Sequence, residues 1–334
     1  MSNISRHSET SERRQTMLRS AFRGAVAAAL DADDVIEVLA NPDGSIWIER
    51  AGVGLAREAE ILNADARERI IRLVAGSIGV ACDRANPVIS AELPGSGERF
   101  EGLLPPVSEG PCFAIRKPAA APYGLDDYVM SGALAPAIAD ALRSSLATRA
   151  NIVISGGTSS GKTTFTNALL AEPAFSEERI VILEDTRELK CAAKNAVALR
   201  THGECASLSR LVRSTMRLRT DRIIVGEVRG AEAHDLLKAR NTGHPGGVTT
   251  LHANSAEGAL SRLEQLAAEA TGAPPQRLIA EAVDVVVFMS RRDGVRRVED
   301  ALRVTGVDGD SYAFAPLCEP RLVSEFKGET HESL

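Results

Sequence analysis

Short apolar runs and helical spacing alternate along the first third of the chain, a pattern that predicts a small α+β domain. Apolar residues recur at helical spacing near its start, at Leu18, Phe22, Ala25, Val26 and Leu30. The apolar runs 35–39 and 45–49 flank the turn sequence NPDG at 41–44 and predict a β-hairpin. The other elements expected here are one helix and two strands, at 64–80, 100–104 and 113–116. Together they predict an N-terminal domain over residues 17–118.

The rest of the chain alternates strand-length apolar runs with helical patterns, which predicts a three-layer α/β domain around a mainly parallel sheet. The predicted strands are 151–155, 179–183, 222–226, 248–251 and 283–289. The predicted helices are 165–170, 207–217, 231–241 and 256–270.

The segments outside these patterns predict the domain boundaries. Residues 119–132 begin with a Pro/Ala/Gly-rich stretch, so we assign them to a linker, and 133–319 to the second domain. The polar ends lack periodicity, so we expect a disordered arm at 1–16 and a flexible tail at 320–334.

Composition narrows the possible classes of protein. The 334 residues are 44% hydrophobic and 25% charged, as in globular chains of about two domains. We expect a cytoplasmic protein, because no stretch approaches the roughly 18 apolar residues of a membrane span and the N-terminus lacks a signal core. Five scattered cysteines without a C-x-x-C spacing fit a reducing compartment and no zinc site. The net charge of −6 argues against a protein that coats DNA.

A glycine-rich loop between a predicted strand and a predicted helix carries the strongest chemical signal. Residues 156–164 read GGTSSGKTT and match G-x-x-x-x-G-K-[ST], so a chance loop is the weaker alternative. Glycines let backbone N–H groups surround phosphate oxygens, Lys162 reaches the β- and γ-phosphates, and the Thr163 hydroxyl can bind Mg²⁺. The sequence therefore predicts a RecA-like P-loop domain that binds a nucleoside triphosphate. The expected contacts are Gly156, Gly157, Thr158, Ser159, Ser160, Gly161, Lys162, Thr163 and Thr164.

Carboxylates follow two of the predicted strands, where an open parallel sheet places its active residues. Glu227 is expected to complete a Mg²⁺ site with Thr163, and the alternative is a solvated turn residue. Glu184 is expected to position the attacking water or act as a general base, with Asp185 and Glu188 as alternatives for that role.

A histidine follows the fourth strand of this domain, in the run TGHPGGVTTLHANS. A histidine after an apolar strand is commonly structural. Because this one belongs to a triphosphate-binding domain, we expect His252 to sense the γ-phosphate.

The order of these motifs resembles the secretion-superfamily ATPases. The P-loop, ILEDTREL, RIIVGEVRG and NTGHPGGVTTLHANS match that superfamily in order. Upstream, LANPDGSIWIER, AELPGSGERFEGLLPPV and FAIRKP resemble its conjugal-transfer branch, the TrbB-type ATPases of type IV secretion systems. The resemblance covers nearly the whole chain except the two ends. The tetracysteine zinc module of many type II secretion ATPases is absent from the sequence, which points away from that branch.

The resemblance also implies roles for residues in both domains. It implies that the catalytic residues of the second domain are Lys162, Glu184, Glu227 and His252. It implies that Arg99 and Arg116 reach the nucleotide from the N-terminal domain, and pairing with acids such as Glu101 is the alternative. The basic run between 210 and 222 could include a subunit-bridging arginine, or be a solvated face.

The resemblance implies a Mg²⁺-dependent ATPase that forms a homo-hexamer and powers conjugative pilus assembly or translocation by a type IV secretion system. Such a ring would bind inner-membrane channel proteins, sit peripherally at that membrane and need no stable contact with nucleic acid. The rivals are a type IV pilus extension or retraction motor, a DNA-stimulated nucleic-acid motor and a nucleotide-regulated scaffold.

Overall fold

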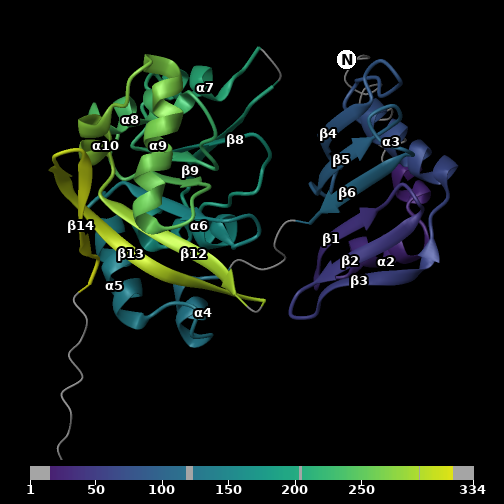
Figure 1. Ribbon diagram of the computed structural model, residues 1–334, viewed down its shortest axis with the longest axis horizontal. Helices are drawn as coiled ribbons and strands as arrows, with labels where there is room; N and C mark the ends of the chain where they lie inside the picture. The colour runs from purple at the N-terminus through teal and green to yellow at the C-terminus, as the bar shows by residue number, and fades with distance from the viewer. Residues whose placement is uncertain (1–15, 118–122, 203–204, 293, 319–334) are drawn as a thin grey trace, which may run out of the picture.

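Two β-sheets with separate cores divide the protein into two domains (Figure 1). The computed structural model describes residues 16–117, 123–202, 205–292 and 294–318. The arm and tail predicted for the two ends lie outside the described residues, except for Thr16. No helix within the described ranges has the length and apolarity to cross a membrane.

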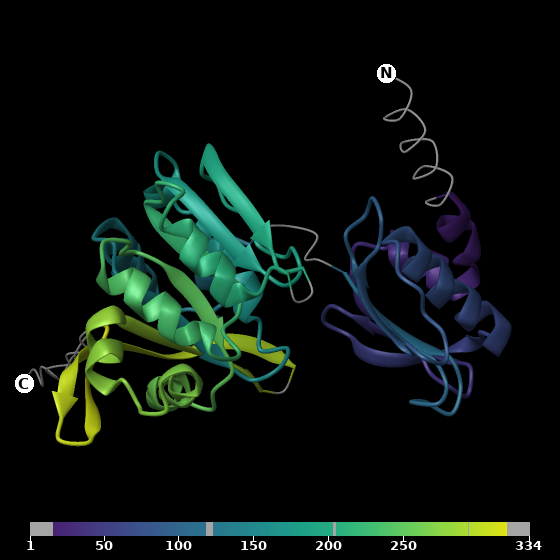
Figure 2. The same ribbon diagram turned by 90° about the horizontal axis from the view of Figure 1, so that it is seen from above.

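The N-terminal domain, at the right of Figure 2, has a six-stranded antiparallel sheet. Its strand order is β3-β2-β1-β6-β5-β4. Its strands are β1 Val35–Ala40, β2 Ser45–Arg50, β3 Gly54–Ile61, β4 Val88–Glu92, β5 Arg99–Leu103 and β6 Cys112–Arg116. Helices α2 (Gly24–Asp31) and α3 (Ala64–Ser77) pack on it through Val26 and Ile70, which are fully buried. The predicted hairpin is confirmed, because β1 and β2 pair antiparallel. In its turn, Asp43 accepts a hydrogen bond from Ser45 N–H at 2.9 Å. The sequence missed β3 and β4, since β3 is exposed on both faces and lacks alternation.

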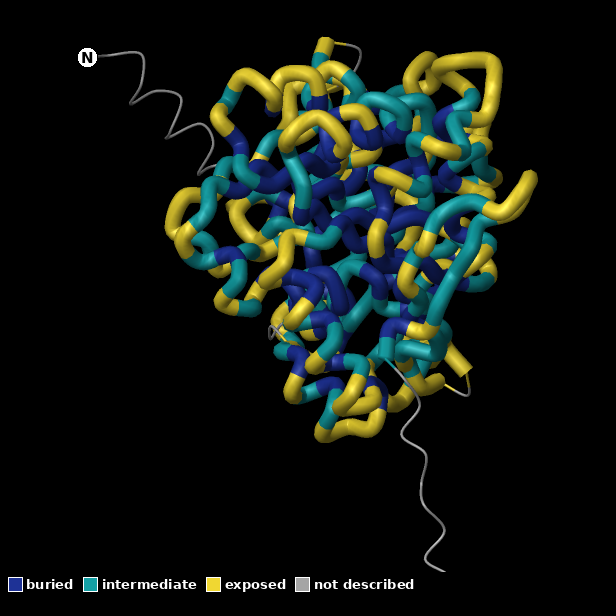
Figure 3. The backbone as a smooth tube through the Cα atoms, turned by 90° about the vertical axis from the view of Figure 1, so that its left-hand side faces the viewer, coloured by how far each residue is buried: buried dark blue, intermediate teal, exposed yellow. Residues whose placement is uncertain are grey.

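The second domain has an eight-stranded sheet in the order β14-β13-β12-β7-β11-β10-β8-β9. The parallel strands are β7 Ile152–Gly156, β8 Arg179–Glu184, β9 Asn195–Arg200, β10 Arg222–Val225, β11 Val248–Leu251 and β12 Val285–Arg292. The strands β13 (Val295–Asp308) and β14 (Ser311–Pro316) continue it antiparallel. The mainly parallel sheet is thus confirmed. Its central strands β7, β10 and β11 are buried along their whole length. Buried backbone, dark blue in Figure 3, fills the interior of the molecule.

Helices cover both faces of this sheet. One face carries α4 Leu125–Met130, α5 Pro136–Ala147 and α6 Lys162–Leu170. The opposite face carries α7 Leu208–Thr215, α8 Glu232–Asn241, α9 Ala256–Thr271 and α10 Gln276–Ala282. The second domain therefore has the three layers expected from the sequence.

The segment assigned to a linker contains part of the second domain. Leu125 is fully buried, and the Tyr128 ring meets Phe165 of α6 edge-on with centroids 5.1 Å apart. Because α4 contributes to this core, the second domain begins within 119–132, earlier than the residue 133 of the prediction. The burial of apolar side chains of α4 decides where the second domain begins. The Pro/Ala/Gly composition of the preceding residues does not reveal this boundary.

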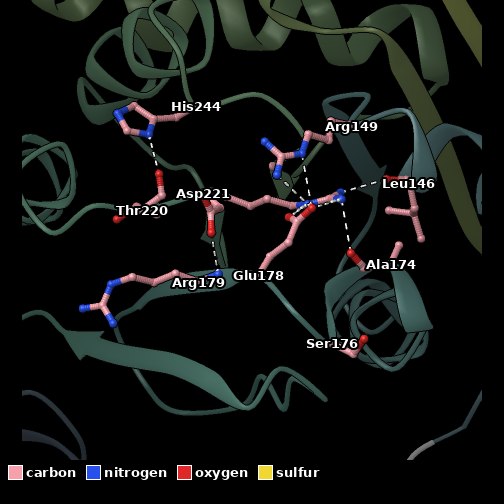
Figure 4. Close-up of polar contacts among 12 residues, drawn as sticks. Leu146, Arg149, Ala174, Ser176, Glu178, Arg179, Thr220, Asp221 and His244 are labelled. Atoms are coloured by element: carbon pink, nitrogen blue, oxygen red, sulfur yellow. Dashed lines mark hydrogen bonds and ion pairs between the residues drawn. The ribbon is translucent and has the colours of Figure 1, made fainter.

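A buried ion pair lies at the amino-terminal edge of the parallel strands (Figure 4). Arg222 is 1% exposed and binds both carboxylate oxygens of Glu178, with Nη2 3.0 Å from Oε1. It also donates to the Leu146 carbonyl at 2.9 Å, and its guanidinium lies 4.8 Å from the Phe175 ring centroid. Arg149 binds the same carboxylate at 3.0 Å. Arg222, the last of the basic run, is therefore a core residue of the second domain and is too deeply buried to serve as the subunit-bridging arginine considered from the sequence.

Candidate nucleotide-binding site

The P-loop connects β7 to α6 at the carboxyl edge of the parallel sheet, the edge at which such sheets bind ligands. Two of its glycines are required by the backbone. A Cβ on Gly156 would lie 2.3 Å from the Met289 carbonyl oxygen, and Gly161 has φ +97° at the start of α6. Ser159 also has a left-handed backbone, with φ +59°.

The polar groups of this loop fit an oxyanion. The buried Ser160 hydroxyl has no hydrogen-bond partner among the described residues, and the first turn of α6 lacks a side-chain cap. Lys162 Nζ donates to the carbonyls of Gly156 and Gly157 at 2.9 and 2.8 Å. Burial lowers the pKa of Lys162 to about 8, so a bound phosphate would stabilise its charged form. An unpaired hydroxyl, free helical N–H groups and a lysine together form a phosphate site.

Glu227, which follows β10, contacts His252 and Arg229, and His252 in turn lies close to Lys162. Its Oε1 lies 2.9 Å from His252 Nε2, and its Oε2 accepts a hydrogen bond from Arg229 at 2.7 Å. His252 Nδ1 lies 3.5 Å from Lys162 Nζ. Burial alone would raise the pKa of Glu227, but Arg229, His252 and Lys162 outweigh burial and lower that pKa, so Glu227 is an anion at neutral pH.

Predicted residues from separate elements meet around a cavity of about 40 Å³ beside the P-loop. Thr163, Glu184 and Glu227 all line it. Its wall also includes Arg99, Asp185, Thr186, Glu188, Gly226 and Arg229. Mg²⁺ prefers a few protein oxygens with water and phosphate oxygens completing its shell, so the Thr163 hydroxyl and Glu227 carboxylate fit Mg²⁺ bound together with a nucleotide. The described residues hold no group of three or more His, Cys, Asp or Glu that could bind a metal unaided.

Glu184 is 5% exposed at the end of β8. Its Oε1 accepts hydrogen bonds from the N–H groups of Glu188 and Leu189, both at 2.8 Å. Burial raises the pKa of Glu184 to about 7 although these two bonds oppose the rise. One oxygen of Glu184 thus fixes the following loop, while the carboxyl group borders the small cavity.

A larger cavity of about 270 Å³ lies between the two domains, with walls from both. Arg99 and Arg116 contribute from the N-terminal domain, and P-loop residues such as Thr163 contribute from the other. Arg99 forms an ion pair with Glu188 at 2.9 Å, so it does not pair with Glu101, the alternative considered from the sequence. Arg116 has no ion pair or side-chain hydrogen bond within the described part of the chain.

The loop after Glu184 is fastened to the N-terminal domain at two points. The Arg187 N–H donates to Glu92 of β4 at 2.9 Å, and the same carboxylate pairs with Arg200 of β9 at 2.6 Å. The neighbouring Glu188 binds Arg99. Movement of one domain against the other must therefore act on the loop that Glu184 holds.

The two histidines of the TGHPGG region separate at opposite ends of β11. His244 precedes the strand, and its Nδ1 lies 2.9 Å from the Thr220 carbonyl at the edge shown in Figure 4. His252 follows the strand and reaches the P-loop. Sequence reasoning missed Arg229 and Arg296, which also border the cavities. No hairpin was predicted at Arg296, so its position beside the P-loop was not expected. The sequence offered one signal there, the two arginine pairs at 291–292 and 296–297.

A P-loop on a parallel sheet, carboxylates at neighbouring strand ends and a second domain beside the phosphate site define a two-domain P-loop nucleotide-binding protein. The profile of the family described as "Type II/IV secretion system protein" matches residues 86–300. The chain therefore belongs to this family, and its similarity to relatives at about 50% identity places it among the TrbB-type ATPases of type IV secretion systems.

Two relatives and one solved structure show the extent of the similarity. The chain is 51% identical over 289 residues to the "Probable conjugal transfer protein TrbB" of Sinorhizobium fredii, covering 86% of this chain and 88% of that protein. It is 50% identical to the "Conjugal transfer protein TrbB" of Rhizobium radiobacter, covering 88% and 91%. The structure of the Legionella pneumophila ATPase DotB has a TM-score of 0.58 at 20% identity, covering 82% of this chain and 78% of that one, which supports the fold alone.

Proposed function

We propose that this protein is a ring-forming, Mg²⁺-dependent ATPase that powers conjugative pilus assembly or substrate translocation by a type IV secretion system. The observation that carries the proposal is the meeting of Thr163, Glu184 and Glu227 around one cavity beside the P-loop. The names of the similar proteins supply the biological process.

In this proposal each predicted residue has a physical task. Lys162 and the loop from Gly156 to Thr164 bind the phosphates, and Thr163 with Glu227 binds Mg²⁺, which neutralises phosphate charge when present. Glu184 orients the attacking water. His252, which lies between Glu227 and Lys162, responds to the γ-phosphate.

The N-terminal domain completes the site in the same proposal. Arg99 and Arg116 line the interdomain cavity, and a guanidinium pairs well with phosphate oxygens. A nucleotide held by both domains favours the closed arrangement, and loss of the γ-phosphate removes contacts that maintain it. The working form is a homo-hexamer on the cytoplasmic side of the inner membrane, held there by channel proteins and without stable binding to nucleic acid.

Steady-state phosphate release from the full chain with Mg-ATP tests this proposal. Lys162→Ala should reduce hydrolysis at least about a hundredfold, the scale for removing one electrostatic contact to a transition state. Lys194→Ala is the matched control, since that exposed lysine pairs with the exposed Glu177. Single-stranded DNA should leave the rate unchanged. Strong stimulation by DNA would instead favour a nucleic-acid motor, and full activity of Lys162→Ala would refute the proposed site.

Hydrolysis should increase as the pH rises through about 7, because the raised pKa of Glu184 keeps part of this carboxyl protonated below that pH. Only the ionised carboxylate can accept a hydrogen bond from the attacking water. Glu184→Gln should lower the rate of hydrolysis, and the activity that remains should no longer rise as the pH passes through about 7. Asp185 is an exposed neighbouring carboxylate that accepts a hydrogen bond from Thr201. Asp185→Asn should therefore keep the rise of the hydrolysis rate near pH 7. An unchanged titration in Glu184→Gln would assign the base elsewhere.

Glu188→Gln should tighten the binding of Mg-ADP about two- to fivefold, the energy scale of a partly exposed ion pair. Glu188 occupies Arg99 at 2.9 Å, so its carboxylate competes with phosphate for that guanidinium. Glu101→Gln, on the same strand as Arg99 but bound to Ser90, should leave the affinity unchanged. Calorimetry measures both. Weaker binding in Glu188→Gln would show that the ion pair supports the site and does not compete with the ligand.

A further inference from the structure

The β12–β13 hairpin contacts both the P-loop and the N-terminal domain. On the P-loop side, Arg296 Nε donates to the Ser159 carbonyl at 3.0 Å, and its Cδ would lie 3.1 Å from a Cβ on Gly161. On the other side, Arg291 Nη1 lies 3.2 Å from Glu49 Oε1 of β2. Glu49 is 13% exposed and Arg291 35%, so this interdomain pair is partly shielded from water.

Arg291 and Arg296 are cross-strand partners within this hairpin. Arg291 of β12 pairs in register with Arg296 of β13. Like charges directly opposite each other on a sheet destabilise it unless anions compensate them. Arg291 has Glu49 as its anion. Arg296 forms no ion pair of its own within the described ranges, where the only carboxylate acting on its charge is the more distant one of the same Glu49.

A second guanidinium, that of Arg116, faces the same space, with Glu37 of β1 opposite it in register. Arg116 and Arg296 both line the interdomain cavity, together with P-loop residues Ser159, Gly161 and Thr163. Burial lowers the pKa of Arg296, the charges of Arg291 and Arg116 add to this effect, and the carboxylate of Glu49 opposes it. Two guanidinium groups that form no ion pair within the described residues and lie beside a phosphate-binding loop provide a place for an anion of high charge.

We infer that Arg296 is a further nucleotide-binding residue, whose guanidinium pairs with phosphate oxygens while its Nε–H holds the Ser159 carbonyl. This inference rests on the nucleotide site of the proposed function. It adds a phosphate contact from a hairpin that no sequence motif marks. Because Arg291 binds Glu49, the same hairpin joins the N-terminal domain to the phosphate site.

Calorimetric binding of ADP to the full chain tests the role of Arg296. Arg296→Gln should weaken binding at least about tenfold, as expected for a lost charge-assisted hydrogen bond. It should also make the affinity less sensitive to salt, since one ionic contact is removed. Arg296→Lys should recover most of the affinity, because it keeps the charge. Arg292→Gln is the matched control, since this hairpin arginine is exposed and pairs with Glu299.

The outcomes separate a phosphate contact from a supporting role. Equal losses in Arg296→Lys and Arg296→Gln, with the salt dependence of the wild type, would overturn the inference, since Arg296 would then only support Ser159. Wild-type affinity in Arg296→Gln would overturn it as well, while loss of binding in Lys162→Ala would keep the proposed site intact. Wild-type affinity in Lys162→Ala would instead refute the proposed site and the inference with it. Equal thermal unfolding midpoints would establish that the variants are folded.

Discussion

Glu227→Gln is expected to reduce ATP hydrolysis at least about a hundredfold while ADP still binds, the scale for losing a preorganised electrostatic contact. The carboxylate contacts His252 at 2.9 Å and Arg229 at 2.7 Å, and it borders the small cavity with Thr163. A neutral amide keeps the size of this side chain but removes the charge that lowers the energy of Mg²⁺ and of a cationic Lys162. Phosphate release and calorimetry on the same preparation measure both quantities.

Glu257→Gln provides the control for Glu227→Gln. Glu257 is exposed in the first turn of α9, after the same sheet edge, and forms no ion pair among the described residues. Its replacement should leave hydrolysis within about twofold of the wild type, as for most surface substitutions. A rate in Glu227→Gln that matches Glu257→Gln would exclude Glu227 from the metal site.

Glu178→Gln is expected to lower the free energy of unfolding by about 3–5 kcal/mol, the cost of removing one partner of a buried ion pair. Arg222 is 1% exposed, and no other carboxylate binds its guanidinium in the described structure, so its charge would remain buried without an anion. Carbonyl oxygens of Leu146 and Ala174 would retain two of its hydrogen bonds. Urea denaturation followed by circular dichroism measures the change.

Glu177→Gln is the matched control for this stability change. Glu177 is the preceding residue and pairs with Lys194, but both side chains are at least three-quarters exposed. An exposed pair of this kind contributes about 1 kcal/mol or less. Equal destabilisation in the two variants would contradict the buried position of the Arg222 pair. A combined Arg222→Met and Glu178→Leu replacement should recover much of the stability, since both charges leave the core together.

The sequence by itself determined the elements whose signals are local. The continuous apolar runs of β7, β8 and β10 predicted the parallel sheet, because a strand buried on both faces has apolar side chains at consecutive positions. The turn at Asn41–Gly44 predicted the first hairpin, because its residue types favour that backbone. The P-loop pattern predicted the phosphate site, since its glycines and Lys162 must be adjacent in the chain to surround one ligand.

Only the tertiary structure decided which distant side chains meet. The ion pair of Arg99 with Glu188 spans 89 residues of sequence, and Arg296 reaches Ser159 across 137. No spacing rule covers such distances, because they depend on how two domains and a hairpin pack. The edge strands β3, β4 and β9 and the antiparallel strands β13 and β14 also escaped prediction. Cross-strand hydrogen bonds stabilise these strands, and backbone groups carry no residue-specific signal in a sequence.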